Sequence, residues 1–142
     1  MHLNVRFSTE AEMKQTLDFL YEKSKEGTAF TGLVEAMVNE ITIVTAIHNI
    51  KSNKGSKTAG VDQAKMDKYL QMPRDELIAL IRDSFNNYRP KPARRVYIPK
   101  KNGKQRPLGI PTVLDRIIQE CVRIVIEPIC EAKFYPHSYG FR

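Results

Sequence analysis

The sequence predicts an α+β fold that is mainly helical and carries one projecting, basic β-hairpin. Apolar residues recur at helical spacing in most of the chain. In contrast, Asn102-Gly103 stands between two short strand-like runs, and Asn-Gly is a strong hairpin signal. The hydrophobic content of 42% is that of a folded chain rather than one disordered throughout. No run of 18 apolar residues occurs, so we expect no membrane association and a cytoplasmic location.

Two helices are predicted in the first 50 residues. Thr9 and Glu12 form a capping-box pattern that opens the first helix, and Gly27 is a suitable stop. A second helix is expected to run without interruption after Thr31. Its predicted apolar face consists of Leu33, Met37, Ile41, Val44 and Ile47.

The rest of the chain predicts a loop, two more helices and the hairpin. Residues 51–62 contain two glycines and three lysines and are expected to form a loop. Pro73 suits the first turn of a third helix, and Thr112 with Asp115 suits the start of a fourth. Pro128 is expected to end or kink that fourth helix.

Residues 94–99 and 105–110 are predicted to be the two strands of the hairpin. A two-residue turn at Asn102-Gly103 would pair Pro99 with Arg106. Strand alternation would then place Lys100 and Arg106 on opposite faces, unless a twist or bulge intervened. Because proline cannot donate to a ladder, both strands are expected to be edges.

The charge is unevenly distributed. Residues 1–50 hold four Lys/Arg against seven Asp/Glu, whereas residues 51–142 hold nineteen against nine. Such a surface favours a polyanion, most commonly nucleic acid, although a solvated basic face without a ligand is the alternative. Between residues 89 and 106 there are eight cations and no acid: Arg89, Lys91, Arg94, Arg95, Lys100, Lys101, Lys104 and Arg106.

Groups suited to catalysis are scarce. The three histidines stand far apart, and Cys121 and Cys130 have the spacing of neither a zinc site nor a disulfide framework. Gly103-Lys104 is followed by Gln105, so it is no Walker phosphate loop. No carboxylates recur in a pattern that suggests a shared metal. We therefore expect the chain alone to be non-catalytic.

Three ordered segments carry a family resemblance. The run from Arg94 to Lys100, followed by Arg106-Pro-Leu-Gly-Ile-Pro-Thr112 and Asp115-Arg-Ile-Ile-Gln119, resembles the first conserved block of group II intron reverse transcriptases. Ser138-Tyr-Gly-Phe-Arg142 resembles the opening of their second block. Asn53-Lys-Gly-Ser56 with Ala59-Gly-Val-Asp62 resembles the segment upstream of both.

The resemblance implies the fingers subdomain of a right-hand polymerase, in residues 51–142, after an N-terminal helical segment in residues 1–50. By analogy, Lys100 and Arg106 would bind the triphosphate of an incoming deoxynucleotide. The RNA or template would meet a larger set: Lys54, Lys57, Arg94, Arg95, Lys101, Lys104, Tyr139 and Arg142. Intron RNA or an RNA template is the implied partner.

The resemblance also indicates what this chain would lack. The Mg²⁺ of the parent enzyme would be held by palm aspartates, including a Tyr-Ala-Asp-Asp type motif that does not occur in this sequence. For the fragment we expect no cofactor and no polymerisation. Two alternatives remain: a non-catalytic RNA-binding splicing module, and a structural or dimerising domain. Apolar surface meant for a palm would favour a homodimer.

Overall fold

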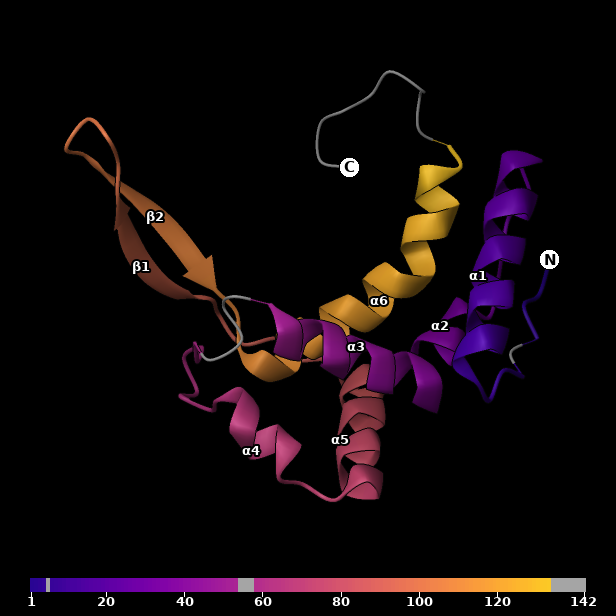
Figure 1. Ribbon diagram of the computed structural model, residues 1–142, viewed down its shortest axis with the longest axis horizontal. Coiled ribbons are helices and arrows are strands. Elements are labelled where there is room, and N and C mark those ends of the chain that lie inside the picture. The colour runs from indigo at the N-terminus through magenta and orange to yellow at the C-terminus, as the bar shows by residue number, and fades with distance from the viewer. Residues whose placement is uncertain (5, 54–57, 134–142) are drawn as a thin grey trace. The chain divides into compact units, whose positions relative to one another are not determined.

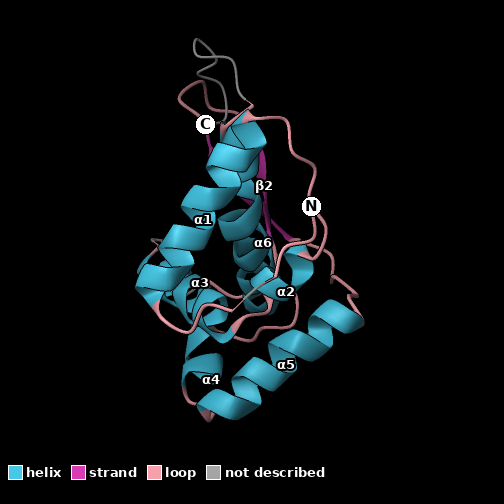
Figure 2. Cartoon of the chain, turned by 90° about the vertical axis from the view of Figure 1, so that its right-hand side faces the viewer, coloured by secondary structure: helices cyan, strands magenta, loops and turns pink. Residues whose placement is uncertain are grey.

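The computed structural model describes residues 1–4, 6–53 and 58–133. Helices predominate among them, and the described strands belong to one two-stranded antiparallel sheet (Figure 2). The mainly helical α+β class predicted from the sequence is therefore confirmed. The chain forms two compact units, Met1–Ala46 with Glu120–Arg142 and Ile47–Gln119. The functional boundary expected at residue 50 stays a prediction.

The first helix begins where the capping pattern predicts. Helix α1 spans Glu10–Lys25 (Figure 1). The Oγ1 of Thr9 accepts a hydrogen bond from the Glu12 N–H over 3.2 Å and donates one to the Glu12 carboxylate over 3.1 Å. The Glu12 N–H would otherwise have no partner within the helix, because the first N–H groups of a helix lack one. Gly27, with φ at +85°, follows the last turn.

The predicted continuous second helix is wrong. Two helices replace it, α2 over Leu33–Met37 and α3 over Glu40–Ser52. Asn39 separates them: its Oδ1 accepts from the Ile41 N–H over 2.9 Å, and its Nδ2 donates to the Phe7 carbonyl over 3.0 Å. Asparagine competes with the helix in this way because its short amide can bond nearby backbone. Within α3, Ile43 is buried whereas Val44 is 38% exposed, contrary to the predicted face.

The unit Met1–Ala46 with Glu120–Arg142 has its own core. Its largest buried apolar side chains include Leu20, Ile43 and Val125. Helix α6 spans Val113–Glu131 and continues past Pro128 rather than ending there. Close to that proline, the Ser24 hydroxyl donates to the Ile129 carbonyl over 2.8 Å. This bond joins α1 to the end of α6 within the unit.

The unit Ile47–Gln119 contains α4, over Met66–Leu70, and α5, over Arg74–Asn86. Pro73 is the residue before α5 rather than its first residue, and α4 is too short to have been signalled by apolar periodicity. The apolar core of this unit is formed by Ile50, Met66, Tyr69, Leu77, Ile78, Ile81, Val113, Ile117 and Ile118. No helix of the described residues is long and apolar enough to cross a membrane.

The hairpin belongs to the same unit as α4 and α5. Strand β1 spans Arg94–Pro99 and β2 spans Gln105–Ile110, the limits predicted from the sequence. Figure 1 shows the paired strands extending away from α4 and α5. Most hairpin residues are exposed on both faces, and only Val96 and Ile110 are half-buried. The projecting hairpin is thus available to a ligand from either side.

Candidate nucleic-acid interface

The hairpin turn has three residues, not the predicted two. The Lys100 N–H donates to the Lys104 carbonyl over 2.6 Å, and the Gly103 N–H donates to the Lys100 carbonyl over 3.1 Å. Gly103 has a φ of +80°. This combination is a turn followed by a left-handed glycine that forms a β-bulge. The ladder consequently pairs Pro99 with Gln105 rather than with Arg106.

The Asn102 side chain explains why the two-residue turn does not form. A two-residue turn of the Asn-Gly type requires positive φ at both residues, but Asn102 does not adopt a positive φ. Instead, its Oδ1 accepts a hydrogen bond from the Lys104 N–H over 3.1 Å. The side chain of Asn102 is therefore hydrogen-bonded to the backbone of the residue two positions later, which is common for asparagine in turns. Only Gly103 takes the left-handed conformation.

The observed register brings Lys100 and Arg106 to one face of the hairpin. Ile98 lies opposite Arg106, and Lys100 is two residues beyond Ile98 along the same strand direction. The two-residue turn would have placed them on opposite faces, but the bulge shifts the pairing by one residue. We call this side the lysine face; its residues are Arg94, Val96, Ile98, Lys100, Lys104, Arg106, Leu108 and Ile110.

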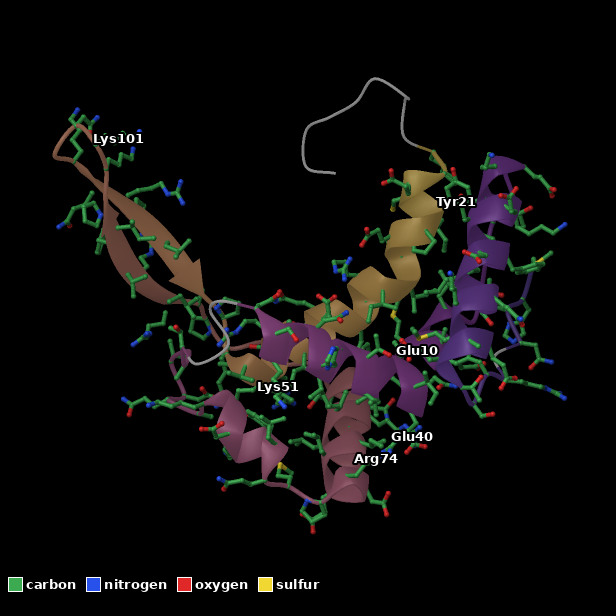
Figure 3. All side chains as sticks on the ribbon, in the orientation of Figure 1. Glu10, Tyr21, Glu40, Lys51, Arg74 and Lys101 are labelled. Atoms are coloured by element: carbon green, nitrogen blue, oxygen red, sulfur yellow. The ribbon has the colours of Figure 1, made fainter. Side chains whose placement is uncertain are left out.

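The lysine face concentrates positive charge. Lys100 and Lys104 are paired directly, a spacing of about 5 Å between Cβ atoms, and Arg106 is the diagonal neighbour of Lys100 at about 7 Å. Like charges directly opposite one another are destabilising in a ladder. Within the described residues, no hairpin cation forms an ion pair with a carboxylate. Figure 3 shows nitrogen-bearing side chains around the tip, where Lys101 is labelled.

The opposite side, which we call the tyrosine face, has a different character. It consists of Arg95, Tyr97, Pro99, Gln105, Pro107 and Gly109, and Tyr97 is 58% exposed. No role for Tyr97 was expected from the sequence. The sequence feature that could have indicated a role is an aromatic residue in a predicted strand, with cations and a proline on either side of it. That signal depends on the strand being exposed on both faces, which only the structure shows.

One hydrogen bond joins the base of the hairpin to the first turn of α6, and two more hold that turn to Thr112, which follows β2. Asp115, only 5% exposed, accepts a hydrogen bond from the Lys91 N–H through Oδ2 over 3.1 Å. The Thr112 Oγ1 accepts from the Asp115 N–H over 3.1 Å, which confirms the predicted cap. The Thr112 carbonyl accepts from the Arg116 N–H over 2.9 Å. The segment entering β1 and the segment leaving β2 are thus held by the same helical turn.

The segment before α4 is attached to the same turn. Gly60 lies so close that an added Cβ would stand 2.6 Å from the Thr112 Cα. The Arg116 guanidinium donates to the Thr58 carbonyl. Burial, together with the carboxylates of Asp62 and Asp115, raises the pKa of Tyr69, whereas burial lowers the pKa of Arg116 against the opposing effect of Asp62. Asp62, Tyr69, Asp115 and Arg116 are therefore close enough to one another to interact electrostatically around the first turn of α6.

Part of the predicted site falls within this arrangement. Arg94, Lys100, Lys104 and Arg106 share the lysine face, whereas Arg95 points to the tyrosine face and Lys101 is in the turn. Four other predicted residues, Lys54, Lys57, Tyr139 and Arg142, lie outside the described residues. In the part of the chain that the structure describes, no three His, Cys, Asp or Glu side chains gather as metal ligands. We assign no metal ligand here.

Comparisons with known proteins show which proteins the chain is similar to. No protein-family model matches the chain. However, the chain is 39% identical to the group II intron-encoded protein LtrA of Lactococcus lactis. The matched region covers 92% of this chain and 22% of LtrA. The chain is homologous to group II intron-encoded proteins. The resemblance seen in its sequence motifs is thereby confirmed.

Two further relatives widen the comparison. The chain is 50% identical to Protein YkfC of Escherichia coli K12, over 64% of this chain and 24% of that protein. It is 30% identical to the putative COX1/OXI3 intron 1 protein of Saccharomyces cerevisiae, over 98% of this chain and 17% of that protein. The chain therefore spans less than a quarter of the length of each of these three relatives.

Proposed function

We propose that this chain is the fingers portion of an RNA-directed DNA polymerase and intron maturase. In this proposal the lysine face binds phosphate, either of an incoming deoxynucleotide or of the RNA. The single observation that carries it is the hairpin register, which sets Lys100, Lys104 and Arg106 together with no ion-pairing carboxylate among the described residues. The homology to intron-encoded proteins supports the choice of RNA among polyanions.

The chemistry assigned to the lysine face is electrostatic. A triphosphate or an RNA backbone brings several negative oxygens within a few ångströms of one another. Lys100 and Lys104 would each supply ammonium donors to such oxygens, and Arg106 could bind two of them at once. An anion between the paired lysines would also remove their mutual repulsion. The proposed Mg²⁺ of a complete polymerase would be held by carboxylates outside this chain.

The attachment of the hairpin to α6 supports this role. Thr58, Gly60 and the segment that enters β1 all contact the first turn of α6, and these parts of the chain lie in or beside the motifs that resemble the family. A projecting ribbon binds an anion with a defined geometry only if its base is fixed. The Asp115–Lys91 hydrogen bond and the close approach of Gly60 to Thr112 supply that fixation.

The test is a titration of the chain with structured intron RNA at several salt concentrations. One variant carries Lys100→Ala, Lys101→Ala, Lys104→Ala and Arg106→Ala. Its matched control removes four exposed cations elsewhere, by Arg6→Ala, Lys14→Ala, Lys25→Ala and Lys133→Ala. If the hairpin binds phosphate, the slope of log affinity against log salt falls by about 3 in the hairpin variant only.

The two other outcomes are equally informative. If both variants lose affinity equally, the attraction is general and the hairpin has no special part in it. If neither variant loses affinity, the RNA contact lies elsewhere and the proposal is wrong. A second titration with a deoxynucleoside triphosphate, using Lys100→Ala/Arg106→Ala, separates nucleotide binding from RNA binding. Loss of RNA affinity alone would leave the fingers without a nucleotide site on this face.

A further inference from the structure

The tyrosine face of the hairpin carries an exposed aromatic ring that the proposed phosphate site does not use. Tyr97 is 58% exposed and lies opposite Pro107, two residues from Arg95 on the same face. An aromatic side chain leaves so much apolar surface in water only at a cost. Exposed tyrosines on strands commonly serve as platforms on which unpaired bases stack.

A hollow lies at the base of the hairpin, and one of its lining residues, Pro107, is the strand partner of Tyr97. The guanidinium-bearing Arg95 is among its lining residues, which otherwise carry no charge. Since Arg95 and Tyr97 are two residues apart in an extended strand, they stand about 7 Å from one another. The lining residues are Pro92, Ala93, Arg95, Pro107, Leu108 and Gly109.

The chemistry of this face differs from that of the lysine face. The lysine face has four cations, whereas the tyrosine face has one cation, one exposed ring, two prolines and an amide. Dense negative charge suits the first, and a flat apolar base with a single phosphate beside it suits the second. The absence of any acid between residues 89 and 106 favours a nucleic acid over a neutral or basic protein surface.

We propose that the tyrosine face binds unpaired nucleotides of single-stranded RNA, with one base stacked on Tyr97 and an adjoining phosphate on Arg95. This deepens the proposed function and rests on it, since it presumes that the hairpin meets RNA at all. The two faces of the hairpin then have different ligands. The lysine face binds phosphates regardless of the attached base, and the tyrosine face binds bases.

The experiment compares two strands of equal length and charge, an oligouridylate and its abasic counterpart. Each is titrated with the full chain, with Tyr97→Ala, with Tyr97→Phe, and with Tyr88→Ala. Tyr88 is 45% exposed but lies outside the hairpin, so its replacement removes a comparable exposed ring. A further variant, Lys100→Ala/Arg106→Ala, reports on the lysine face.

If Tyr97 stacks on a base, Tyr97→Ala binds the oligouridylate about 5- to 150-fold more weakly, which is the usual effect of losing one aromatic stack. Binding of the abasic strand is unchanged in the same variant. Tyr97→Phe keeps the affinity because it keeps the ring, and Tyr88→Ala has no effect. The lysine-face variant weakens both strands alike.

Other results overturn the inference in distinguishable ways. If Tyr97→Ala leaves both strands unaffected while the lysine-face variant weakens both, stacking is rejected and the proposed phosphate site stands. If Tyr97→Ala weakens both strands equally, the ring supports hairpin structure and does not read bases. If no variant affects either strand, the proposed function fails together with this inference. If Tyr97→Ala leaves the binding of both strands unchanged but lowers the mass of the protein measured by light scattering, the tyrosine face binds a second copy of the chain.

Discussion

The carboxylate of Asp115 accepts a hydrogen bond from the backbone N–H of Lys91 over 3.1 Å. The bond joins the first turn of α6 to the segment that enters β1. Since the donor is main chain, the identity of residue 91 is immaterial to the contact. Asp115 is 5% exposed, so its carboxylate depends on this and neighbouring protein groups for its hydrogen bonds.

Asp115→Ala is expected to lower the free energy of unfolding by about 1.5–3 kcal/mol, the usual net contribution of a hydrogen bond to a charged group. It should also speed hydrogen exchange at the Lys91 amide. Asp115→Asn keeps an accepting oxygen and should lose less. Urea unfolding and amide exchange measure both effects, with Asp83→Ala on the exposed side of α5 as the control. Unchanged exchange at Lys91 in the Asp115→Ala protein would contradict the contact.

Gly60→Ala is expected to destabilise the chain by about 1–3 kcal/mol, because the new Cβ would stand 2.6 Å from the Thr112 Cα and main chain would have to move. Gly109→Ala is the comparison. There an added Cβ meets only the Ala93 methyl group at 3.2 Å, so we expect a change within about 0.5 kcal/mol. Thermal or urea unfolding gives the difference. Equal costs at both positions would mean that Gly60 does not approach Thr112 so closely.

The hairpin register predicts specific proton contacts. In NMR spectra, strong nuclear Overhauser effects between Hα protons should connect Tyr97 with Pro107 and Pro99 with Gln105. A two-residue turn would instead bring Pro99 opposite Arg106. Gly103→Asn should preserve the pattern, since asparagine tolerates a positive φ, whereas Gly103→Val should weaken it. Retention of the pattern in Gly103→Val would show that the left-handed residue is not needed.

Cys121 is expected to resist alkylation at pH 8 in the folded chain, while the half-buried Cys130 reacts. Burial, with a smaller effect of Glu120, raises the pKa of the Cys121 thiol to about 12, so almost no thiolate forms. In the unfolded chain the thiol ionises near pH 8.5, so as the pH rises the unfolded state loses this proton before the folded state does. Stability present below pH 8.5 is lost as the pH rises toward 12. Urea unfolding from pH 7 to 10 should show that decline, and Cys121→Ala should reduce it.

The sequence predicted the strands and the start of the first helix more reliably than the breaks between helices. The limits of both strands and the start of α1 are local: they depend on prolines, on Asn-Gly and on a capping pair that act over a few residues. The break at Asn39 was missed because part of its cause is the Phe7 carbonyl, 32 residues away. Likewise α4 is too short for periodicity to reveal, and its burial depends on the rest of its unit.

The candidate site was predicted by residue type but not by geometry. Lys100 and Arg106 could be named from charge and resemblance, yet their common face depends on one bulged residue, and a shift of one residue reverses every side chain in a strand. Asp115 was read as a plain helix cap, and its second bond, to Lys91, joins segments 24 residues apart. No local pattern in the sequence encodes such a contact.

Pro99 and Pro107 have a consequence for the whole hairpin. Hydrogen-bonded pairs alternate along an antiparallel ladder, so the bonded Lys100–Lys104 pair leaves Pro99 and Pro107 at positions whose N–H would point away from the partner strand. Each strand therefore loses one outward donor, and no bond between the strands is sacrificed. A third strand, from another copy or from a nascent chain, meets an interrupted row of donors on either side. The ribbon can expose Tyr97, Ile98 and Leu108 to solvent without offering a template for intermolecular sheet growth.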